Sequence, residues 1–221
     1  MGDIHGAYKA LIQCLERARF SYAEDQLIAL GDVSDGWPDV KRCVDELLKI
    51  KNLVYILGNH DLWTHNWMNS GEVNSIWLAQ GGEATIKSYE EGVPEAHKKF
   101  FRQAHLYYEL ENKFFVHAGI LPHSPLDEQN ESIFLWDRSL ANMAMDAERK
   151  SLKKQFTDYK EIYIGHTPAH KLPYKACNVW LMDTGAAWDG CLSMMDIDSK
   201  EVFSSDPVPG LYPDSIGRLR L

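Results

Sequence analysis

Short apolar segments followed by glycine and a polar side chain are the feature that most constrains the fold. Gln26–Leu30 and Leu53–Leu57 are such segments, and a carboxylate or an amide follows the glycine in each case. Residues 7–20 and residues 37–50 carry apolar side chains at helical spacing. Strands that alternate with helices in this way predict an α/β fold with a largely parallel sheet.

The remaining chain continues this pattern. Further strands are expected at 106–110, 113–116, 161–164, 178–182, 191–197 and 201–204, with a helix over 139–156. The first two of these strands are expected to form a hairpin around Glu111-Asn112, and the last two a closing hairpin. Residues 61–105 are rich in Trp and His and predict a helical cap or insertion, broken at Gly81-Gly82 and near Gly92. Residues 206–221 contain three prolines and predict an extended tail. Without a linker or an internal repeat, we expect a single domain over residues 1–221.

The composition argues against several classes of protein. With 221 residues, of which 45% are hydrophobic and 25% charged, the chain fits an ordinary globular domain. Its net charge of −9 argues against a nucleic-acid partner, although bound cations could still attract an anionic substrate. Four cysteines without a C-x-x-C pair predict free thiols and a cytoplasmic protein. With no signal peptide and no apolar stretch long enough to span a membrane, we expect no membrane partner.

The segment Gly2–Gly6 has the same mixture of glycine, carboxylate and imidazole, but only Met1 precedes it. A segment of this kind is expected to follow a strand. We therefore expect that strand either to be missing or to lie upstream of residue 1.

Six of these glycine-rich junctions carry side chains that can bind a metal ion or transfer a proton. They are Asp3 with His5, Asp32 with Asp35, Asn59 with His60, His117, His166 and Asp183. Because the carboxyl ends of strands form the ligand-binding edge of open α/β sheets, we expect these side chains to converge. The junctions carry no thiolate, which argues against a structural zinc site. Imidazole, carboxylate and amide ligands favour Mn, Fe, Zn or Ni over Ca or Mg.

The residue types also indicate a reaction. Asp32 follows a central strand and is placed to bridge two ions. Two metal ions about 3.5–4 Å apart can hold a hydroxide between them and clamp the oxygens of a phosphoryl group. His60 stands next to Asn59 and is the predicted general acid, with Asp35 as the carboxylate that orients it.

Five sequence motifs resemble those of the calcineurin-like metallophosphoesterases. The motifs are Asp3-x-His5-Gly6, Gly31-Asp32-x-x-Asp35-Gly36, Gly58-Asn59-His60-Asp61, His117-Ala118-Gly119 and Gly165-His166-Thr167-Pro168. They are most similar to the phosphoprotein phosphatase branch, which includes bacterial serine/threonine phosphatases and symmetrical diadenosine tetraphosphate hydrolases.

This resemblance implies a four-layer α/β/β/α sandwich and two divalent or trivalent metal ions, with manganese favoured. It implies metal ligands at the matching positions, which are Asp3 and His5 for the first metal, Asp32 as the bridge, and Asn59, His117 and His166 for the second. His60, paired with Asp35, would be the proton donor.

One position departs from the family pattern. Many members carry arginine directly after the second aspartate of the second motif, where it grips the substrate phosphate, but this chain has Gly36. A guanidinium is hard to replace there, because it offers a bidentate fork to phosphate oxygens. Arg138 is the predicted phosphate-binding residue, although it could instead cap the helix that follows it.

Three functions are compatible with the sequence. The first is hydrolysis of phosphomonoesters, either phosphoserine and phosphothreonine or small phosphate esters, by direct attack of a hydroxide shared by the two metals with His60 as general acid. The second is symmetrical hydrolysis of diadenosine polyphosphates. The third is a non-catalytic binding module on a degenerate phosphatase scaffold. The Trp and Tyr residues of 63–89 either line a substrate groove or pack in the core of the cap.

Overall fold

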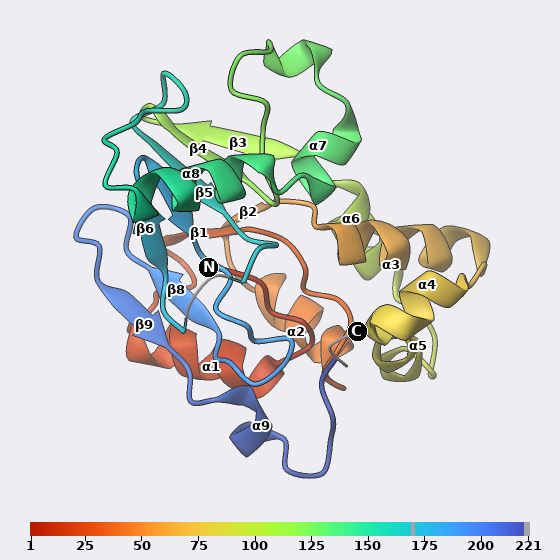
Figure 1. Ribbon diagram of the computed structural model, residues 1–221. Helices are drawn as coiled ribbons and strands as arrows, with labels where there is room; N and C mark the ends of the chain where they lie inside the picture. Colours follow the sequence, from red (N-terminus) through yellow and green to blue (C-terminus); the bar gives the residue numbers. More distant parts are fainter. Residues whose placement is uncertain (169–170, 219–221) are drawn as a thin grey trace.

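The computed structural model describes residues 1–168 and 171–218, and it places two β-layers between helices (Figure 1). The first β-layer contains the parallel pair β1 (Gln26–Ala29) and β2 (Asn52–Tyr55) and the antiparallel pair β8 (Ser193–Met195) and β9 (Val202–Ser204). The second is a mixed sheet with strand order β3-β4-β5-β7-β6. Its strands are β3 (Tyr107–Leu110), β4 (Lys113–Val116), β5 (Glu161–Ile164), β7 (Val179–Leu181) and β6 (Tyr174–Ala176).

Helices cover the outer faces of both β-layers. On the first layer lie α1 (Tyr8–Arg17) and α2 (Val40–Leu47), and on the second lie α7 (Glu131–Trp136) and α8 (Ser139–Arg149). The other helical segments are α3 (Asn59–Ser70), α4 (Ser75–Trp77), η1 (Leu78–Gly82), α5 (Glu83–Ser88), α6 (Glu95–Arg102), η2 (Leu126–Glu128) and α9 (Val208–Leu211). The predicted four-layer α/β/β/α sandwich is confirmed.

The central strands are buried on both faces. In β1, Leu27 and Ala29 belong to the core under α1 and α2, whereas Ile28 belongs to the core between the β-layers. In β5, Ile162 faces α8 and Tyr163 faces the other β-layer. Successive side chains of a strand point to opposite faces, so a strand covered on both sides is a continuous apolar run.

The segment predicted as a helical cap is α3 to α6, and it lies at one side of the sandwich (Figure 1). It is interrupted where the sequence indicated, since Gly81 and Gly92 have φ values of 101° and 108°. The helix α3 begins at Asn59, directly after β2 and its exit turn, so two predicted site residues, Asn59 and His60, stand on its first turn.

The hairpin predicted around Glu111-Asn112 is confirmed in the second sheet, which is otherwise less parallel than the alternation of strands and helices predicts. Its centre is parallel, but both edge strands pair antiparallel to their neighbours. The turn between β3 and β4 is Glu111-Asn112, with φ values of 49° and 60°, and so short a turn can join only antiparallel strands. The edge strand β6 was not predicted. The helix expected over 139–156 ends earlier, at Arg149, where Ser151 turns the backbone into the left-handed region (φ 56°).

The prediction of an extended C-terminal tail is wrong for part of the segment. Val208–Leu211 form α9, and both Val208 and Tyr212 are buried in the core under α1 and α2. Tyr212 also stacks on Trp37, with ring centroids 5.3 Å apart. Prolines dominate the pattern of this segment, but its apolar residues at helical spacing supply enough buried surface to hold it against the domain.

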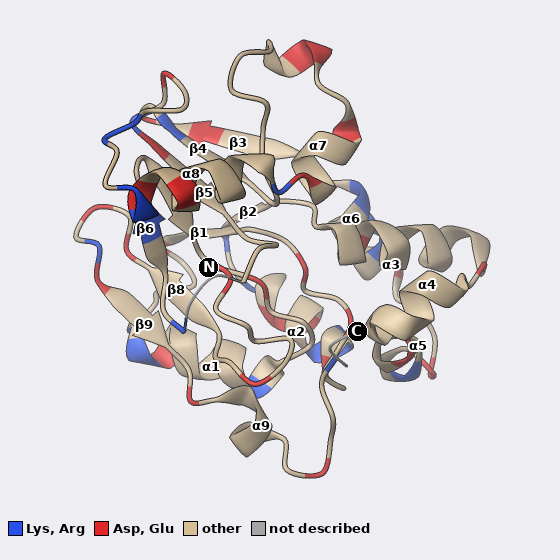
Figure 2. Cartoon of the chain, in the orientation of Figure 1, with Lys and Arg blue, Asp and Glu red and all other residues tan. Residues whose placement is uncertain are grey.

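Acidic and basic residues are interspersed over the elements seen in Figure 2. Among the residues that the structure describes, no helix combines the length and the hydropathy needed to cross a membrane.

Leu11→Ala should destabilise the protein, because Leu11 lies fully buried between α1 and the first β-layer. A buried leucine replaced by alanine costs about 2–5 kcal/mol of unfolding free energy. Urea unfolding of the metal-free protein measures the change. Leu152→Ala makes the same chemical change at a side chain that is 52% exposed, and it should cost about 1 kcal/mol or less. Equal losses in the two variants would contradict the assigned core.

Candidate active site

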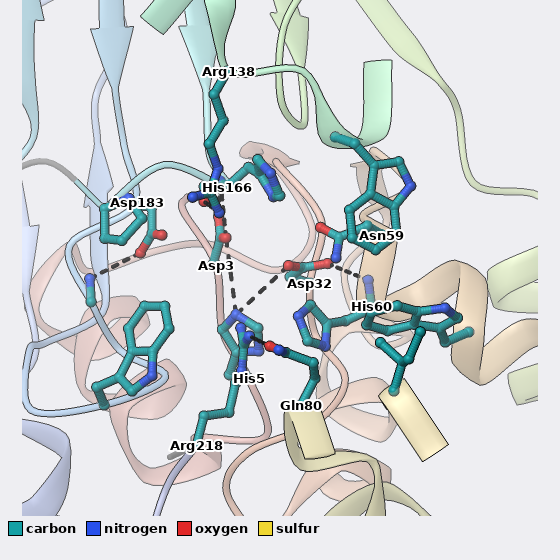
Figure 3. Close-up of a pocket in the computed structure, with 16 residues that line it drawn as sticks. Asp3, His5, Asp32, Asn59, His60, Gln80, Arg138, His166, Asp183 and Arg218 are labelled. Atoms are coloured by element: carbon teal, nitrogen blue, oxygen red, sulfur yellow. Dashed lines mark hydrogen bonds and ion pairs between the residues drawn. The ribbon is translucent and has the colours of Figure 1, made fainter. Parts of the chain in front are cut away.

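Loops that follow the strands of both β-layers meet at one cavity of about 860 Å³. Asp32 follows β1, Asn59 follows β2, His166 follows β5 and Asp183 follows β7. The cavity is also lined by residues from the N-terminal segment, the cap and the loop before α8, among them Asp3, His5, His60 and Arg138 (Figure 3). All predicted site residues except Asp35 and His117 line the cavity, and these two lie directly behind it as buried partners of His60 and Asp32.

Two groups of side chains have the composition of metal sites, and Asp32 belongs to both. The ligand atoms of Asp3, His5 and Asp32 lie within 4.8 Å of one another, and those of Asp32, His117 and His166 do the same. The Asp32 Oδ2 atom is 3.7 Å from His5 Nε2 and 3.4 Å from His117 Nε2. The predicted bridging position of Asp32 agrees with this arrangement.

Backbone carbonyls orient two of the imidazoles. His117 Nδ1 lies 2.7 Å from the carbonyl of Leu30, and His5 Nδ1 lies 3.0 Å from the carbonyl of Ser34. In a neutral imidazole each Nδ1–H would donate to the carbonyl, which leaves the Nε2 lone pair directed at the carboxylates. Asn59 Oδ1 lies 2.9 Å from His117 Nε2, so the amide oxygen and the imidazole can serve the same cation.

Two motif glycines are required because the backbone passes against a ligand. A Cβ atom at Gly58 would lie 2.1 Å from Asp32 Oδ1, and one at Gly165 would lie 2.2 Å from Asp3 Oδ1. No rearrangement of a flexible neighbour can relieve these contacts, because both carboxylates are buried and hydrogen-bonded. The glycines before Asn59 and His166 therefore set the distance between ligands from different strands.

The site is rich in buried negative charge. Burial would raise the pKa of Asp32, but His117, His60 and His5 outweigh this effect and hold it well below its usual value. Burial likewise opposes protonation of His117, yet Asp32 and Asp3 raise its pKa to about 10. Burial and the neighbouring Asp183 raise the pKa of Asp3. Carboxylates crowded in this way are stabilised by cations, so the donor set fits two metal ions.

His60 and Asp35 form the predicted dyad. His60 Nδ1 lies 2.5 Å from Asp35 Oδ2, and the His60 backbone N–H donates to Asp32 Oδ1 at 3.0 Å. Asp35 is fully buried and also accepts hydrogen bonds from Trp77 Nε1 and, at 2.6 Å, from Thr85 Oγ1. Sequence reasoning did not find Trp77 or Thr85 as partners of the site, because nothing in the pattern of the cap distinguishes them from packing residues.

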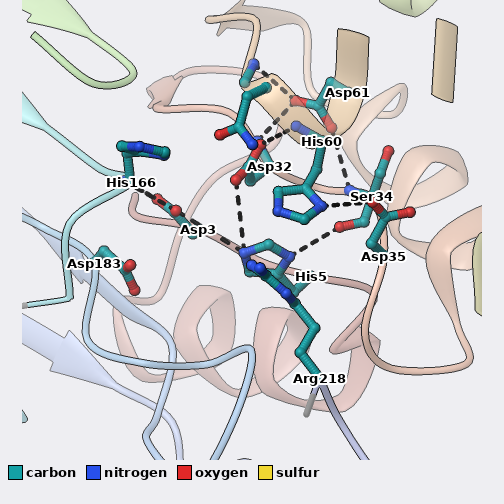
Figure 4. A network of polar contacts seen from close by, with 12 residues as sticks. Asp3, His5, Asp32, Ser34, Asp35, His60, Asp61, His166, Asp183 and Arg218 are labelled. Carbon is teal, nitrogen blue, oxygen red and sulfur yellow. Dashed lines mark hydrogen bonds and ion pairs between the residues drawn. The ribbon is translucent and has the colours of Figure 1, made fainter. Parts of the chain in front are cut away.

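Asp61, the last residue of the motif Gly58-Asn59-His60-Asp61, joins two loops of the site. Its carboxylate accepts five hydrogen bonds. Figure 4 shows Asp61 beside two of the residues that it contacts, Asp32 and Ser34. The donors are the backbone N–H groups of Asp32 (2.7 Å), Val33 (3.0 Å), Ser34 (3.2 Å) and Gly58 (3.0 Å) and the hydroxyl of Tyr55 (2.7 Å). The loop after β1 is thereby fixed to the loop after β2.

Two arginines reach the cavity. Arg138 is exposed at its rim, and its Nη2 atom donates to the carbonyl of His166 at 3.4 Å. Arg218 lines the same cavity from the C-terminal segment and was not identified from the sequence. An extended tail, as the sequence predicts, carries no signal that would place Arg218 at the site.

Some of the aromatic residues line the cavity and others do not. Trp63 and Trp136 contribute to its wall with an edge-to-face contact at 5.0 Å between ring centroids, and Trp188 lies beside Arg218. Trp77, by contrast, is buried, and it contacts the partly buried Trp67. The two interpretations of the cap aromatics therefore each hold for different residues.

A four-layer sandwich with a carboxylate–histidine cluster at its strand ends is the arrangement of metallophosphoesterases. The family model described as calcineurin-like phosphoesterase matches residues 1–188, and the chain belongs to this family. It is a hydrolase, and the third interpretation, a non-catalytic scaffold, is not needed to account for any feature of the site.

Relatives with two activities resemble this chain. Serine/threonine-protein phosphatase 1 of Salmonella typhimurium is 27% identical, in an alignment that covers 89% of this chain and 90% of the relative. The symmetrical bis(5'-nucleosyl)-tetraphosphatase of Pseudomonas fluorescens is 25% identical, with 96% of each covered. The solved structure of a candidate diadenosine tetraphosphatase has a TM-score of 0.68 at 18% identity, covers 93% of this chain and shares its fold.

Asp183→Asn should reduce the pH dependence of stability in the metal-free protein. Burial raises the pKa of Asp183 to about 6 despite a hydrogen bond from the Gly185 N–H, and Asp32 adds to the increase. A carboxyl whose pKa rises on folding binds its proton more tightly when folded, so the free energy of unfolding falls as the pH rises from about 4 to about 6. In Asp183→Asn, the fall in the free energy of unfolding over this pH range should be smaller by about 2–3 kcal/mol.

Urea unfolding between these pH values, with a chelator present, measures the effect. Asp127→Asn removes an exposed carboxylate and should leave the pH dependence as in the wild type. The same slope in wild type and Asp183→Asn would contradict the assigned environment.

Proposed function

We propose that this protein is a metal-dependent phosphatase that hydrolyses phosphomonoesters, either phosphoserine and phosphothreonine residues or small phosphate esters. The observation that carries the proposal is the His60–Asp35 pair. It lies beside two groups of side chains that could bind metal ions, at a single cavity. A histidine oriented by a carboxylate next to the bound phosphate can donate a proton to a leaving alcohol. The serine/threonine phosphatase among the relatives supports this reaction.

The residues divide into three roles. Asp3 and His5 would hold one metal ion, His117, His166 and Asn59 the other, and Asp32 both. When bound, the pair of ions would lower the pKa of the attacking water and neutralise charge on the phosphate oxygens. We favour manganese, with iron, zinc or nickel as alternatives, on the basis of the mixed imidazole, carboxylate and amide donors.

His60 would act as the general acid. Its Nδ1 atom is occupied by Asp35, so Nε2 is the nitrogen that can give a proton to the leaving oxygen. Asp35 prevents rotation of the His60 ring, because its own oxygens are fixed by Trp77 and Thr85. Arg138 would bind a phosphate oxygen from the rim of the cavity.

The four cysteines are free, which supports a cytoplasmic location. The net charge of −9 supports a phosphorylated substrate held by metals and not a nucleic-acid partner.

His60→Asn and Asp32→Asn should separate proton transfer from metal binding. With p-nitrophenyl phosphate and added manganese, His60→Asn should lower kcat by about 10²- to 10⁴-fold and keep its metal. Asp32→Asn should lose both activity and metal, because it removes the ligand shared by the two groups. Metal analysis of the purified variants provides the second measurement.

His123→Asn, at an exposed histidine, is the matched control and should behave as the wild type. Absence of turnover by the wild-type protein with any of the four metals would refute the proposal.

A second candidate function is favoured by the aromatic wall. Trp63 and Trp136 present ring surface in the same cavity as the ligand groups, and an adenine base could stack there. Symmetrical tetraphosphatases are also among the relatives. The same two-metal site would then cleave a phosphoanhydride instead of a phosphate ester.

Diadenosine tetraphosphate tests this second function. Symmetrical cleavage yields ADP alone, which chromatography of the products detects. Trp63→Ala should then raise KM for diadenosine tetraphosphate by about tenfold or more, because stacking of a base contributes about 1–3 kcal/mol. KM for p-nitrophenyl phosphate should change far less. Formation of AMP and ATP, or equal changes in KM for the two substrates in Trp63→Ala, would contradict this second function.

A further inference from the structure

The side chain of Arg218 enters the active-site cavity from the C-terminal segment. Its backbone N–H donates to the carbonyl of Ala187 at 2.9 Å, which fixes the segment beside the loop after β7. From there the side chain extends toward His5 (Figure 4). Arg218 and Arg138 approach the ligand groups from opposite sides (Figure 3).

Two glycines leave the space through which the Arg218 side chain passes. A Cβ atom at Gly36 would lie 3.3 Å from Arg218 Cγ, and one at Gly81 would lie 3.0 Å from the same atom. The two glycines are joined by a hydrogen bond from Gly36 N to Gly81 O. Position 36, where the family pattern has an arginine and this chain has glycine, is thus covered by the side chain of Arg218.

The guanidinium is held in place but retains free donors. It lies 4.9 Å from the ring centroid of Trp188, and its Nη2 atom donates to Gln80 Oε1. Its Nε atom is buried and has no hydrogen-bond partner among residues 1–168 and 171–218. Among the residues that the structure describes, the Arg218 guanidinium forms no ion pair with a carboxylate, in contrast to Arg17, Arg42, Arg102 and Arg149. An arginine offers five N–H donors, so most of them remain available to a ligand.

The surrounding charge keeps this arginine directed at the site. Burial lowers the pKa of Arg218, while Asp32, Asp35, Asp183 and Asp3 act in the opposite direction. A guanidinium stays protonated in proteins, so Arg218 contributes a fixed positive charge beside the buried carboxylates.

We propose that Arg218 binds oxygens of the substrate phosphoryl group from the space above Gly36. This inference rests on the proposed phosphoesterase function. Gly36 has no side chain that could contact the phosphate, and the inference assigns this contact to Arg218 in the C-terminal segment. A planar fork of donors suits a tetrahedral phosphate, and the Trp188 ring and Gln80 fix its plane before substrate arrives. The phosphoryl group would be bound between Arg218 and Arg138.

Arg218→Ala in the full-length, manganese-loaded protein tests the proposal. A charged bidentate contact contributes about 1.5–3 kcal/mol to binding, so its loss corresponds to about 10- to 100-fold weaker binding. The Kd for inorganic phosphate, measured by calorimetry, should rise by that factor, and KM for p-nitrophenyl phosphate should rise with it. Metal content should stay at the wild-type level, because Arg218 belongs to neither ligand group.

Two further variants complete the experiment. Arg149→Ala removes an exposed arginine of α8 and should leave the Kd for phosphate unchanged. If Arg218→Ala lowers Tm, Arg218→Gln, which retains much of the stem over the glycines, decides by the same phosphate titration. A Kd for phosphate within twofold of wild type in a folded variant would overturn the assignment of Arg218.

The phosphate titration also separates the two proposals. A wild-type protein that binds phosphate through Arg218 but turns over no ester would refute the proposed reaction and leave the binding role standing. A wild-type protein that turns over ester while Arg218→Ala binds phosphate normally would refute only the role of Arg218.

Discussion

The buried carboxylate of Asp61 joins the two loops that carry Asp32 and His60. Its five hydrogen bonds fix the backbone around Asp32 and the backbone at Gly58. Asp32 in turn accepts a hydrogen bond from the His60 N–H. Without this carboxylate several buried N–H groups would lose their partner, at a cost of about 1–3 kcal/mol each. The relative position of Asp32 and His60 is therefore set by one side chain that does not line the cavity.

Side chains of the helical cap form hydrogen bonds with the candidate site as well as packing in the core. Trp77 and Thr85 reach Asp35 from α4 and α5, and Asp35 fixes the ring of His60. A histidine ring held by a buried and hydrogen-bonded carboxylate has a fixed orientation. This chain of contacts also explains why some tryptophans of the cap are buried while Trp63 lines the cavity.

The absence of a side chain at position 36 affects a remote part of the structure. Gly36 and Gly81 leave room for the Arg218 side chain, and Tyr212 stacked on Trp37 anchors the segment that carries it. The C-terminal segment is thus part of the wall of the cavity. The Arg218 guanidinium therefore places a positive charge next to the buried carboxylates of the site.

The sequence by itself determined the fold class and most of the residues that meet at the candidate site. Strands covered on both faces are continuous apolar runs, and the carboxyl ends of parallel strands lie at one edge, so polar residues after glycine could be assigned to one site. Only the tertiary structure decided which other side chains reach that site. Trp77 and Thr85 lie 42 and 50 positions from Asp35, and no local periodicity encodes such contacts. Arg218 reaches the cavity because distant glycines leave it space, and that complementarity of shape exists only in the folded chain.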